Sequence, residues 1–107
     1  MLNKVYQVPY GTKDILPGEM KRRRKIENAI LDVFENWGYE EVKTPGFEYA
    51  DTFGSMVKDS DFRFFDRNNN LLVLRNDMTA PIARLAATRL QHGEKAKRLC
   101  YLANLFR

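Results

Sequence analysis

Three side chains that could together bind a small charged molecule occur close together in the sequence, at Arg75, Asp77 and Thr79. The apolar run at 71–74 before them predicts a strand, and a helical pattern begins at about residue 80. A strand end and a helix start both leave backbone groups unpaired. Arginine can hold a carboxylate through two hydrogen bonds, aspartate can pair with an ammonium group, and threonine can donate or accept. The arrangement therefore fits a receptor for a ligand that carries both charges, such as an amino acid.

The same residues also fit a purely structural interpretation. Asp77 or Thr79 would cap the helix, and Pro81 would lie in its first turn. Arg75 would then be an ordinary surface charge. Residue types alone leave both interpretations open, and helix caps are the commoner of the two.

Other patterns that carry chemistry do not occur in the sequence. There is no glycine-rich phosphate loop and no spacing typical of zinc ligands. His92 stands alone beside Gly93, where a histidine commonly interacts with a helix dipole. Cys100 has no partner for an internal disulfide, and its apolar neighbours predict burial. We therefore expect no catalytic residue, no metal and no cofactor.

Length and composition indicate one small folded domain. The chain has 107 residues, of which 44% are hydrophobic and 30% charged. Much of the net charge of +4 comes from five consecutive basic residues at 21–25, which point all round a helix. We expect a solvated helix start there and do not expect nucleic-acid binding. With neither a signal peptide nor an apolar run that could span a membrane, we expect the cytoplasm.

The first half of the chain predicts one long helix and one short strand. The helix covers 19–37 and is ended by Gly38. Its apolar residues recur at intervals of three and four, at Ile26, Ala29, Ile30, Val33, Phe34 and Trp37. A short strand at 39–43 follows, and Pro45 stops it. Its two glutamates, Glu40 and Glu41, are expected to be exposed.

The second half predicts a hairpin, a helix and a final strand. Residues 49–61 have the pattern of a helix or a loop, and 62–75 that of an antiparallel hairpin with an asparagine-rich turn. We expect its aromatic cluster, Phe62, Phe64 and Phe65, to pack in a core or an interface rather than against bases. A helix at 80–92 would be ended by Gly93, and the apolar run at 99–106 predicts a strand covered on both faces.

The expected fold is α+β, an antiparallel sheet backed by the helices at 19–37 and 80–92. A chain that stops at Arg107, directly after a buried strand, is expected to be the N-terminal portion, residues 1–107, of a single domain in a longer protein.

Taken in order, several segments resemble the start of the catalytic domain of a class II aminoacyl-tRNA synthetase of the histidyl type. Residues 11–17, Gly-Thr-Lys-Asp-Ile-Leu-Pro, resemble that family's opening signature. Residues 37–48 are similar to motif 1, and 74–84 resemble the histidine-binding segment. Phe-Arg at 106–107 looks like the opening of motif 2. The resemblance covers nearly the whole chain in the correct order.

Details of the junction favour one branch of that family. Histidyl-tRNA synthetases usually carry Arg-Pro-Glu-Gly-Thr, where this chain has Arg-Asn-Asp-Met-Thr at 75–79. Asp77 followed by methionine, and Pro-Ile-Ala-Arg at 81–84, resemble the regulatory subunit of ATP phosphoribosyltransferase. That relative does not aminoacylate tRNA. The lead at 101–104 into the Phe-Arg pair is also more similar to it. Asn76 stands where both branches usually have proline, and this replacement is expected to loosen the backbone.

The resemblance implies a non-catalytic regulatory subunit that activates the short-form catalytic subunit and senses histidine in the first step of histidine biosynthesis. The alternative is an active histidyl-tRNA synthetase, which activates histidine with ATP and charges tRNA. In either case Asp77 would pair with the ammonium group of histidine, Thr79 would hydrogen-bond nearby, and Arg107 would approach the carboxylate. The rest of motif 2 and motif 3 do not occur in these residues, so the fragment alone is expected to be inactive.

The resemblance also implies partners. Motif 1 builds a homodimer interface in this superfamily, and a hetero-oligomer with the catalytic subunit would contain that homodimer. The candidate interface residues in this chain are Trp37, Tyr39, Val42, Pro45 and Glu48.

Overall fold

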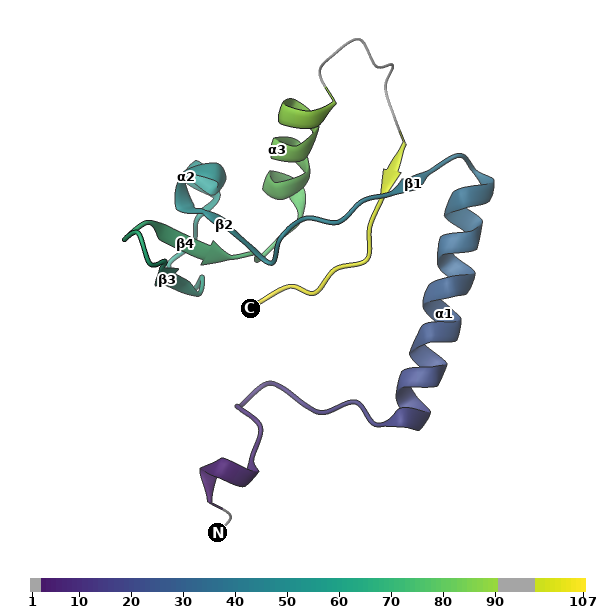
Figure 1. Ribbon diagram of the computed structural model, residues 1–107, viewed down its shortest axis with the longest axis horizontal. Helices are drawn as coiled ribbons and strands as arrows, with labels where there is room; N and C mark the ends of the chain where they lie inside the picture. The colour runs from purple at the N-terminus through teal and green to yellow at the C-terminus, as the bar shows by residue number, and fades with distance from the viewer. Residues whose placement is uncertain (1–2, 91–97) are drawn as a thin grey trace. The chain divides into compact units, whose positions relative to one another are not determined.

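The computed structural model describes residues 3–90 and 98–107 (Figure 1). The chain divides into two compact units, Met1–Trp37 and Gly38–Arg107. The expected packing of the first helix against the sheet would join the two units, and it stays a prediction, as does the single domain. His92 and Gly93, the expected end of the second helix, lie outside the described residues.

The first unit consists of a short 3-10 helix, η1 (Lys4–Tyr6), and one long helix, α1 (Pro17–Asn36). Pro17 is the first helical residue, where its missing N–H costs no hydrogen bond. The Trp37 N–H donates to the Val33 carbonyl at 3.2 Å, and Gly38 follows with φ 83°. Only glycine adopts that left-handed conformation without strain. The predicted long helix and its glycine stop are confirmed.

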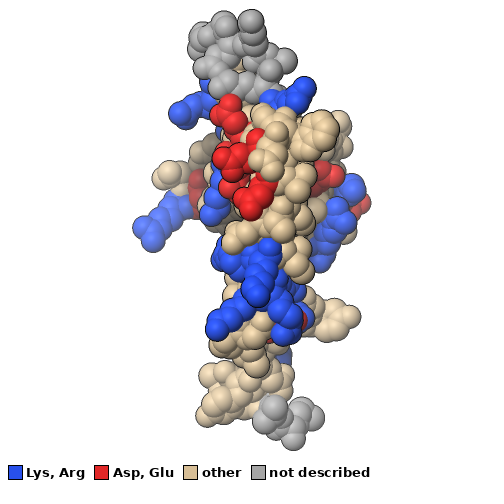
Figure 2. All heavy atoms as spheres, turned by 90° about the vertical axis from the view of Figure 1, so that its right-hand side faces the viewer, with Lys and Arg blue, Asp and Glu red and all other residues tan. Residues whose placement is uncertain are grey.

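The basic block at the start of α1 is exposed at all five of its positions, 21–25. Arg23 pairs with Glu19 at 3.8 Å, and Arg24 pairs with Glu27 at 3.3 Å. Figure 2 shows lysine and arginine side chains gathered in its lower half, with acidic side chains above them. Surface pairs of this kind contribute little to stability. The expected solvated helix start is confirmed.

The second unit contains a three-stranded antiparallel sheet in the order β2-β4-β3. The strands are β2 (Phe47–Tyr49), β3 (Arg63–Phe65) and β4 (Leu71–Leu74), with Glu48 opposite Val73 and Phe64 opposite Leu72. The predicted hairpin is confirmed.

Its turn depends on Asp66, whose carboxylate accepts the N–H groups of Asn68 and Asn70 at 2.9 and 2.8 Å. Asn69 takes the positive φ of 62° that the turn requires.

A small core lies between the sheet and two helices. Helix α2 (Ala50–Phe53) and the 3-10 turn η2 (Gly54–Met56) follow β2 directly, and α3 (Thr79–Arg89) follows β4. Phe53 from α2, Val73 from β4 and Ala80 from α3 are buried together, with Ala50 and Val57 against them. The weak pattern at 49–61 therefore contains α2 and η2, while β2 begins before it. The antiparallel sheet with flanking helices agrees with the predicted α+β class.

A second, two-stranded sheet is parallel, which differs from the expected antiparallel pairing. Strand β1 (Glu40–Glu41) pairs with β5 (Leu99–Cys100), and Glu40 lies opposite Leu99. Both glutamates are exposed and Cys100 is buried, as predicted. In the part of the chain that the structure describes, no helix has the length and apolar character required to cross a bilayer.

The prediction of a covered strand over residues 99–106 is confirmed only for Leu99–Cys100 and is wrong for residues 101–106. Strand pairing stops at Cys100, and residues 101–107 are extended and exposed. The Phe106 N–H donates instead to the Arg75 carbonyl at 2.9 Å. Residues 101–107 thus run beside the residues that follow β4, and Phe106 makes its backbone hydrogen bond there rather than with a neighbouring strand.

Candidate functional site

Asp77 lies between the end of β4 and the start of α3. Its Oδ1 accepts hydrogen bonds from the Thr79 N–H and from the Thr79 hydroxyl, each at 2.9 Å. Thr79 is the first residue of α3, so Asp77 satisfies one of the free donors at the helix start. Pro81 lies in the first turn and is buried. The N-cap residue itself is Met78, which makes no side-chain capping hydrogen bond, so the capping interpretation holds only in that Asp77, one residue earlier, accepts the N–H of the first helical residue. Both hydrogen bonds from Thr79 use Oδ1, so the carboxylate keeps acceptor capacity on Oδ2.

The pKa of Asp77 is held below its usual value of about 3.8. The hydrogen bond from the Thr79 N–H is the largest cause, and the Thr79 hydroxyl, the Met78 N–H and the charge of Arg107 act in the same direction. The small degree of burial would raise the pKa, but this effect is weaker than the two hydrogen bonds from Thr79, because the side chain is exposed. Asp77 is therefore an ionised carboxylate that a cationic group can reach.

Arg107 lies beside the same junction. Its Nε donates to the Asn76 carbonyl at 3.3 Å, and its charge acts on the Asp77 carboxyl. The structure thus brings together the three predicted ligand-binding residues, Asp77, Thr79 and Arg107, from positions about thirty residues apart in the chain. An anionic and a cationic group lie near each other at an exposed helix start.

A pocket of about 280 Å³ opens at this junction. Apolar side chains from α2, η2 and α3 line one part of it, and Lys58, Asn76, Asp77 and Thr79 line the rest. Sequence reasoning missed the contribution of residues 53–58. Neither periodicity nor motif marks that stretch, and only its fold against α3 brings it to Asp77.

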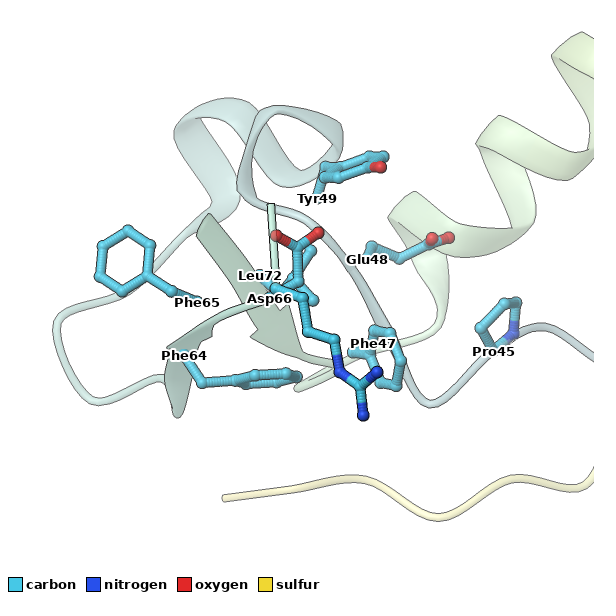
Figure 3. Close-up of a pocket in the computed structure, with 9 residues that line it drawn as sticks. Pro45, Phe47, Glu48, Tyr49, Phe64, Phe65, Asp66 and Leu72 are labelled. Carbon is cyan, nitrogen blue, oxygen red and sulfur yellow. The ribbon is translucent and has the colours of Figure 1, made fainter. Parts of the chain in front are cut away.

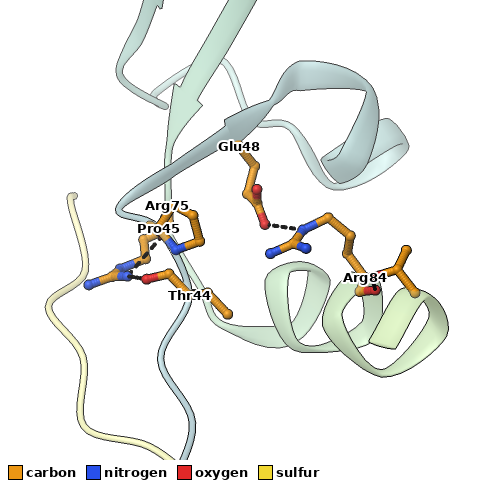
Figure 4. Close-up of polar contacts among 6 residues, drawn as sticks. Thr44, Pro45, Glu48, Arg75 and Arg84 are labelled. Carbon is orange, nitrogen blue, oxygen red and sulfur yellow. Dashed lines mark hydrogen bonds and ion pairs between the residues drawn. The ribbon is translucent and has the colours of Figure 1, made fainter. Parts of the chain in front are cut away.

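Arg75 is neither a ligand-facing group nor a surface charge, so both sequence interpretations of it were wrong. It is 8% exposed, and its side chain donates to three backbone carbonyls. Nε donates to Asn104 O at 2.6 Å, and Nη1 donates to Thr44 O at 3.2 Å and to Pro45 O at 3.1 Å. Figure 4 shows the guanidinium at the crossing of these chain segments. We call these three contacts the Arg75 bridge.

Asn76 is also fixed, contrary to the expected loosening of the backbone. It is 8% exposed, and its Nδ2 donates to Asp61 Oδ1 at 2.7 Å. Asp61 Oδ2 in turn accepts the Lys58 N–H at 2.7 Å. The Lys58 N–H, followed by the Asn76 amide, keeps the pKa of Asp61 below its usual range. A side-chain hydrogen bond here gives the restraint that a proline ring would otherwise supply.

The five candidate interface residues lie in different surroundings. Glu48 is 8% exposed and accepts Arg84 Nε at 2.6 Å, so its carboxylate is used inside the chain (Figure 4). Trp37 and Pro45 are exposed, and the Arg98 guanidinium lies 6.0 Å from the half-buried ring of Tyr39. The N–H of half-buried Val42 donates to Cys100 O at 2.9 Å. The homodimer itself stays a prediction.

A second hollow, of about 440 Å³, lies on the open face of the three-stranded sheet (Figure 3). The rings of Phe47 and Phe64 meet edge to face there, with centroids 5.5 Å apart. Phe62, Phe64 and Phe65 are 50%, 38% and 64% exposed, so the expectation that they form a core is wrong. Packing in an interface stays a prediction for them. Within residues 3–90 and 98–107, no group of three His, Cys, Asp or Glu side chains could hold a metal ion.

Comparison with known proteins relates this geometry to a family. The profile described as histidyl-tRNA synthetase matches residues 11–107. The chain belongs to the histidyl-tRNA synthetase family. Within this family it is similar to the ATP phosphoribosyltransferase regulatory subunit of Moorella thermoacetica, with 46% identity over 98% of the chain. The corresponding subunit of Thermoanaerobacter pseudethanolicus is 44% identical over 94% of the chain.

Solved structures of the family have the same fold. An ATP phosphoribosyltransferase regulatory subunit/histidyl-tRNA synthetase from Bacillus halodurans matches 95% of the chain with a TM-score of 0.85 and 38% identity. The apo histidyl-tRNA synthetase of Staphylococcus aureus matches 94% with a TM-score of 0.82 and 30% identity. The fold is therefore that of a class II histidyl-tRNA synthetase-like domain, as the sequence predicted.

These relatives are much longer than the chain. The matched region is 28% of the Moorella protein and 26% of the Thermoanaerobacter protein. Of the solved structures, it covers 28% of the Bacillus chain and 25% of the Staphylococcus chain. The chain thus spans about a quarter of the family members that it matches.

Proposed function

We propose that this chain is the N-terminal part of a non-catalytic regulatory subunit of ATP phosphoribosyltransferase. Its relatives at 40% to 46% identity carry that name, and they support the assignment. In this proposal the protein activates a separate short-form catalytic subunit in the first step of histidine biosynthesis. It works in the cytoplasm as a homodimer within a hetero-oligomer, and the residues of this chain alone have no catalytic activity.

The observation that carries the proposal is the exposed, ionised carboxylate of Asp77 in a pocket beside the charge of Arg107. A free amino acid carries an ammonium and a carboxylate on one carbon atom, so it needs two opposite charges close together. Asp77 accepts the ammonium group and Arg107 donates to the carboxylate. Thr79 orients Asp77 and offers its own hydroxyl to the ligand. We assign histidine as that amino acid because the family profile that matches the chain is that of histidyl-tRNA synthetase.

Regulation requires histidine to bind one arrangement of the complex more tightly than another. Because residues of α2 and α3 both line this site, ligand binding acts directly on the contact between those two helices. A ligand that bound both arrangements equally would change nothing, however tightly it bound.

An active histidyl-tRNA synthetase is the second candidate. The family profile and the Staphylococcus structure favour it, since both concern the synthetase itself. The same three residues would serve there, because a synthetase must also bind histidine before activating it. The two candidates differ in what the bound histidine does next.

The test combines the full-length protein with a short-form phosphoribosyltransferase catalytic subunit. Formation of phosphoribosyl-ATP is followed with and without histidine. Activation that histidine suppresses is the expected result. No activation, together with histidine-dependent exchange of pyrophosphate into ATP by the protein alone, would establish the synthetase instead.

A further inference from the structure

We infer that Arg75 is a positioning residue for Arg107, and that it sets the affinity of the site for the carboxylate of an amino acid. The inference rests on the proposed amino-acid-binding function of Asp77, Thr79 and Arg107. Arg75 itself does not line the pocket at Asp77. It acts through the backbone of the segment that carries Arg107.

Three hydrogen bonds connect residues 75–76 to the segment that ends in Arg107. Arg75 Nε donates to Asn104 O at 2.6 Å, and the Phe106 N–H donates back to Arg75 O at 2.9 Å. Arg107 Nε donates to Asn76 O at 3.3 Å. In the part of the chain that the structure describes, residues 101–107 are exposed and make no strand pairing, and these bonds hold them beside the junction. The Arg75 side chain supplies the shortest of the three.

The other half of the Arg75 bridge fixes Arg75 itself. Its Nη1 donates to Thr44 O and Pro45 O, and its own N–H donates to Gly46 O at 3.1 Å. Residues 44–46 lead into β2, which pairs with β4. Figure 4 shows the guanidinium bonded to Thr44 and Pro45 on this side, and the same group donates to Asn104 O. Its planar group presents donors in fixed directions to two separate chain segments.

This arrangement separates two functions in one site. Asp77 and Thr79 belong to the start of α3 and do not depend on residues 101–107 for their hydrogen bonds. Arg107 belongs to that segment, whose backbone is bonded to Arg75 at Asn104 and Phe106. Disturbing the Arg75 bridge should therefore weaken recognition of the ligand's carboxylate and leave recognition of its ammonium group unchanged. A general loss of structure would weaken both.

The test measures binding of two ligands to full-length Arg75→Lys by calorimetry. Histidine carries the carboxylate, and histidinol carries a hydroxymethyl group in its place. A lysine ammonium is a single point donor and cannot serve both segments as the guanidinium does. We expect histidine to bind at least about tenfold more weakly, the scale of losing a charged hydrogen bond, and histidinol to stay within about twofold. Arg67→Lys, in the exposed β3–β4 turn, is the matched control.

Equal weakening of both ligands would overturn the inference, because Arg75 would then be only a structural residue. Unchanged binding of both would overturn it as well. Should Arg75→Lys fail to fold, Asn104→Gly loosens the same segment from its other side. That variant is expected to weaken histidine by about two- to fivefold, since glycine adds backbone freedom of roughly 1 kcal/mol, and to spare histidinol.

A measurement without ligand separates this inference from the proposed function. Amide hydrogen exchange in residues 104–107 should become faster in Arg75→Lys, while exchange in α3 stays unchanged. If the wild-type protein bound no histidine, the proposed function would fail, and the exchange pattern would still decide whether Arg75 places Arg107. Unchanged exchange at 104–107 would overturn the positioning role.

Discussion

Two pairs of neighbouring residues at one junction have opposite surroundings. Arg75 and Asn76 are buried, each 8% exposed, and their side chains are bonded to distant parts of the chain. Asp77 and Thr79, which follow at the start of α3, are exposed, and the Thr79 side chain donates to the Asp77 carboxylate. The charged side chain that looked best suited to grip a ligand is used for architecture. The carboxylate that looked like a simple helix cap is the one that a ligand can reach.

The comparison teaches that charge alone does not identify a binding residue. A buried guanidinium is stable here because backbone carbonyls take its donors. An exposed carboxylate keeps free acceptor capacity after capping the helix. What differs between the two residues is which hydrogen-bond capacity remains after the chain has folded.

The largest expected effect comes from replacing Arg75 with a side chain of similar length and no donors. Arg75→Met removes the donor from three carbonyl oxygens, of which that of Thr44 belongs to a buried residue, and should lower the free energy of unfolding by about 2–4 kcal/mol. Urea denaturation measures it. Arg67→Met, at an exposed turn position, should change it by less than about 0.5 kcal/mol. Equal effects of the two variants would break the contrast between a structural and an exposed arginine.

A second change tests the other side of the comparison. Asp77→Asn keeps an oxygen that can accept the Thr79 N–H but removes the charge. Histidine should bind about 1–3 kcal/mol more weakly by calorimetry, because an ammonium group loses its charged partner, while the melting temperature changes little. Asp51→Asn, at an exposed position in α2, is the control. An unchanged affinity for histidine would remove Asp77 from the site.

A third change compares the contact of Arg84 with a charged acceptor, Glu48, to the contacts of Arg75 with neutral carbonyl oxygens. Glu48→Gln keeps the shape of the side chain that accepts Arg84 Nε at 2.6 Å. The expected loss of stability is about 1–2 kcal/mol, smaller than at Arg75, because Arg84 is 32% exposed and water can solvate it. Glu41→Gln on β1 is the exposed control. A loss larger than that of Arg75→Met would reverse the ranking.

The smallest effect is the pH dependence that Asp77 contributes. Its pKa is lower in the folded chain than the usual value of about 3.8. The unfolded chain therefore binds the proton more readily, so this contribution is fully present above the unfolded pKa and is lost as the pH falls through the folded pKa. Stability measured between about pH 6 and pH 2 should decline at the acid end, and Asp77→Asn should make that decline shallower. Identical curves would show that the carboxylate has no structural role.

Local patterns in the sequence predicted the local structure well. The apolar spacing of α1, Gly38 after it and the hairpin with Asn69 depend on neighbours a few residues apart, and each is present. The features that were missed depend on contacts far along the chain. Strand β2 was missed because it is defined by its pairing with β4, and the parallel pairing of β5 with β1 likewise joins segments that are far apart in the sequence.

The candidate site divides in the same way. Resemblance to a family placed Asp77, Thr79 and Arg107 together. Residue chemistry alone had suggested either a receptor made of Arg75, Asp77 and Thr79 or a helix cap, without Arg107. The burial of Arg75 could not be read from its neighbours, because its acceptors lie 29 to 31 residues away. The contribution of residues 53–58 to the pocket was hidden for the same reason.

The Arg75 bridge has a consequence for how this region evolves. Its acceptors are carbonyl oxygens of Thr44, Pro45 and Asn104, and every amino acid carries that group. Substitutions at those three positions can accumulate without breaking the contacts, provided that the backbone keeps its path. An alignment of relatives should therefore show a constrained arginine whose partners drift independently, with no covarying pair to reveal them. Methods that infer contacts from correlated substitutions would overlook the bridge that orients Arg107.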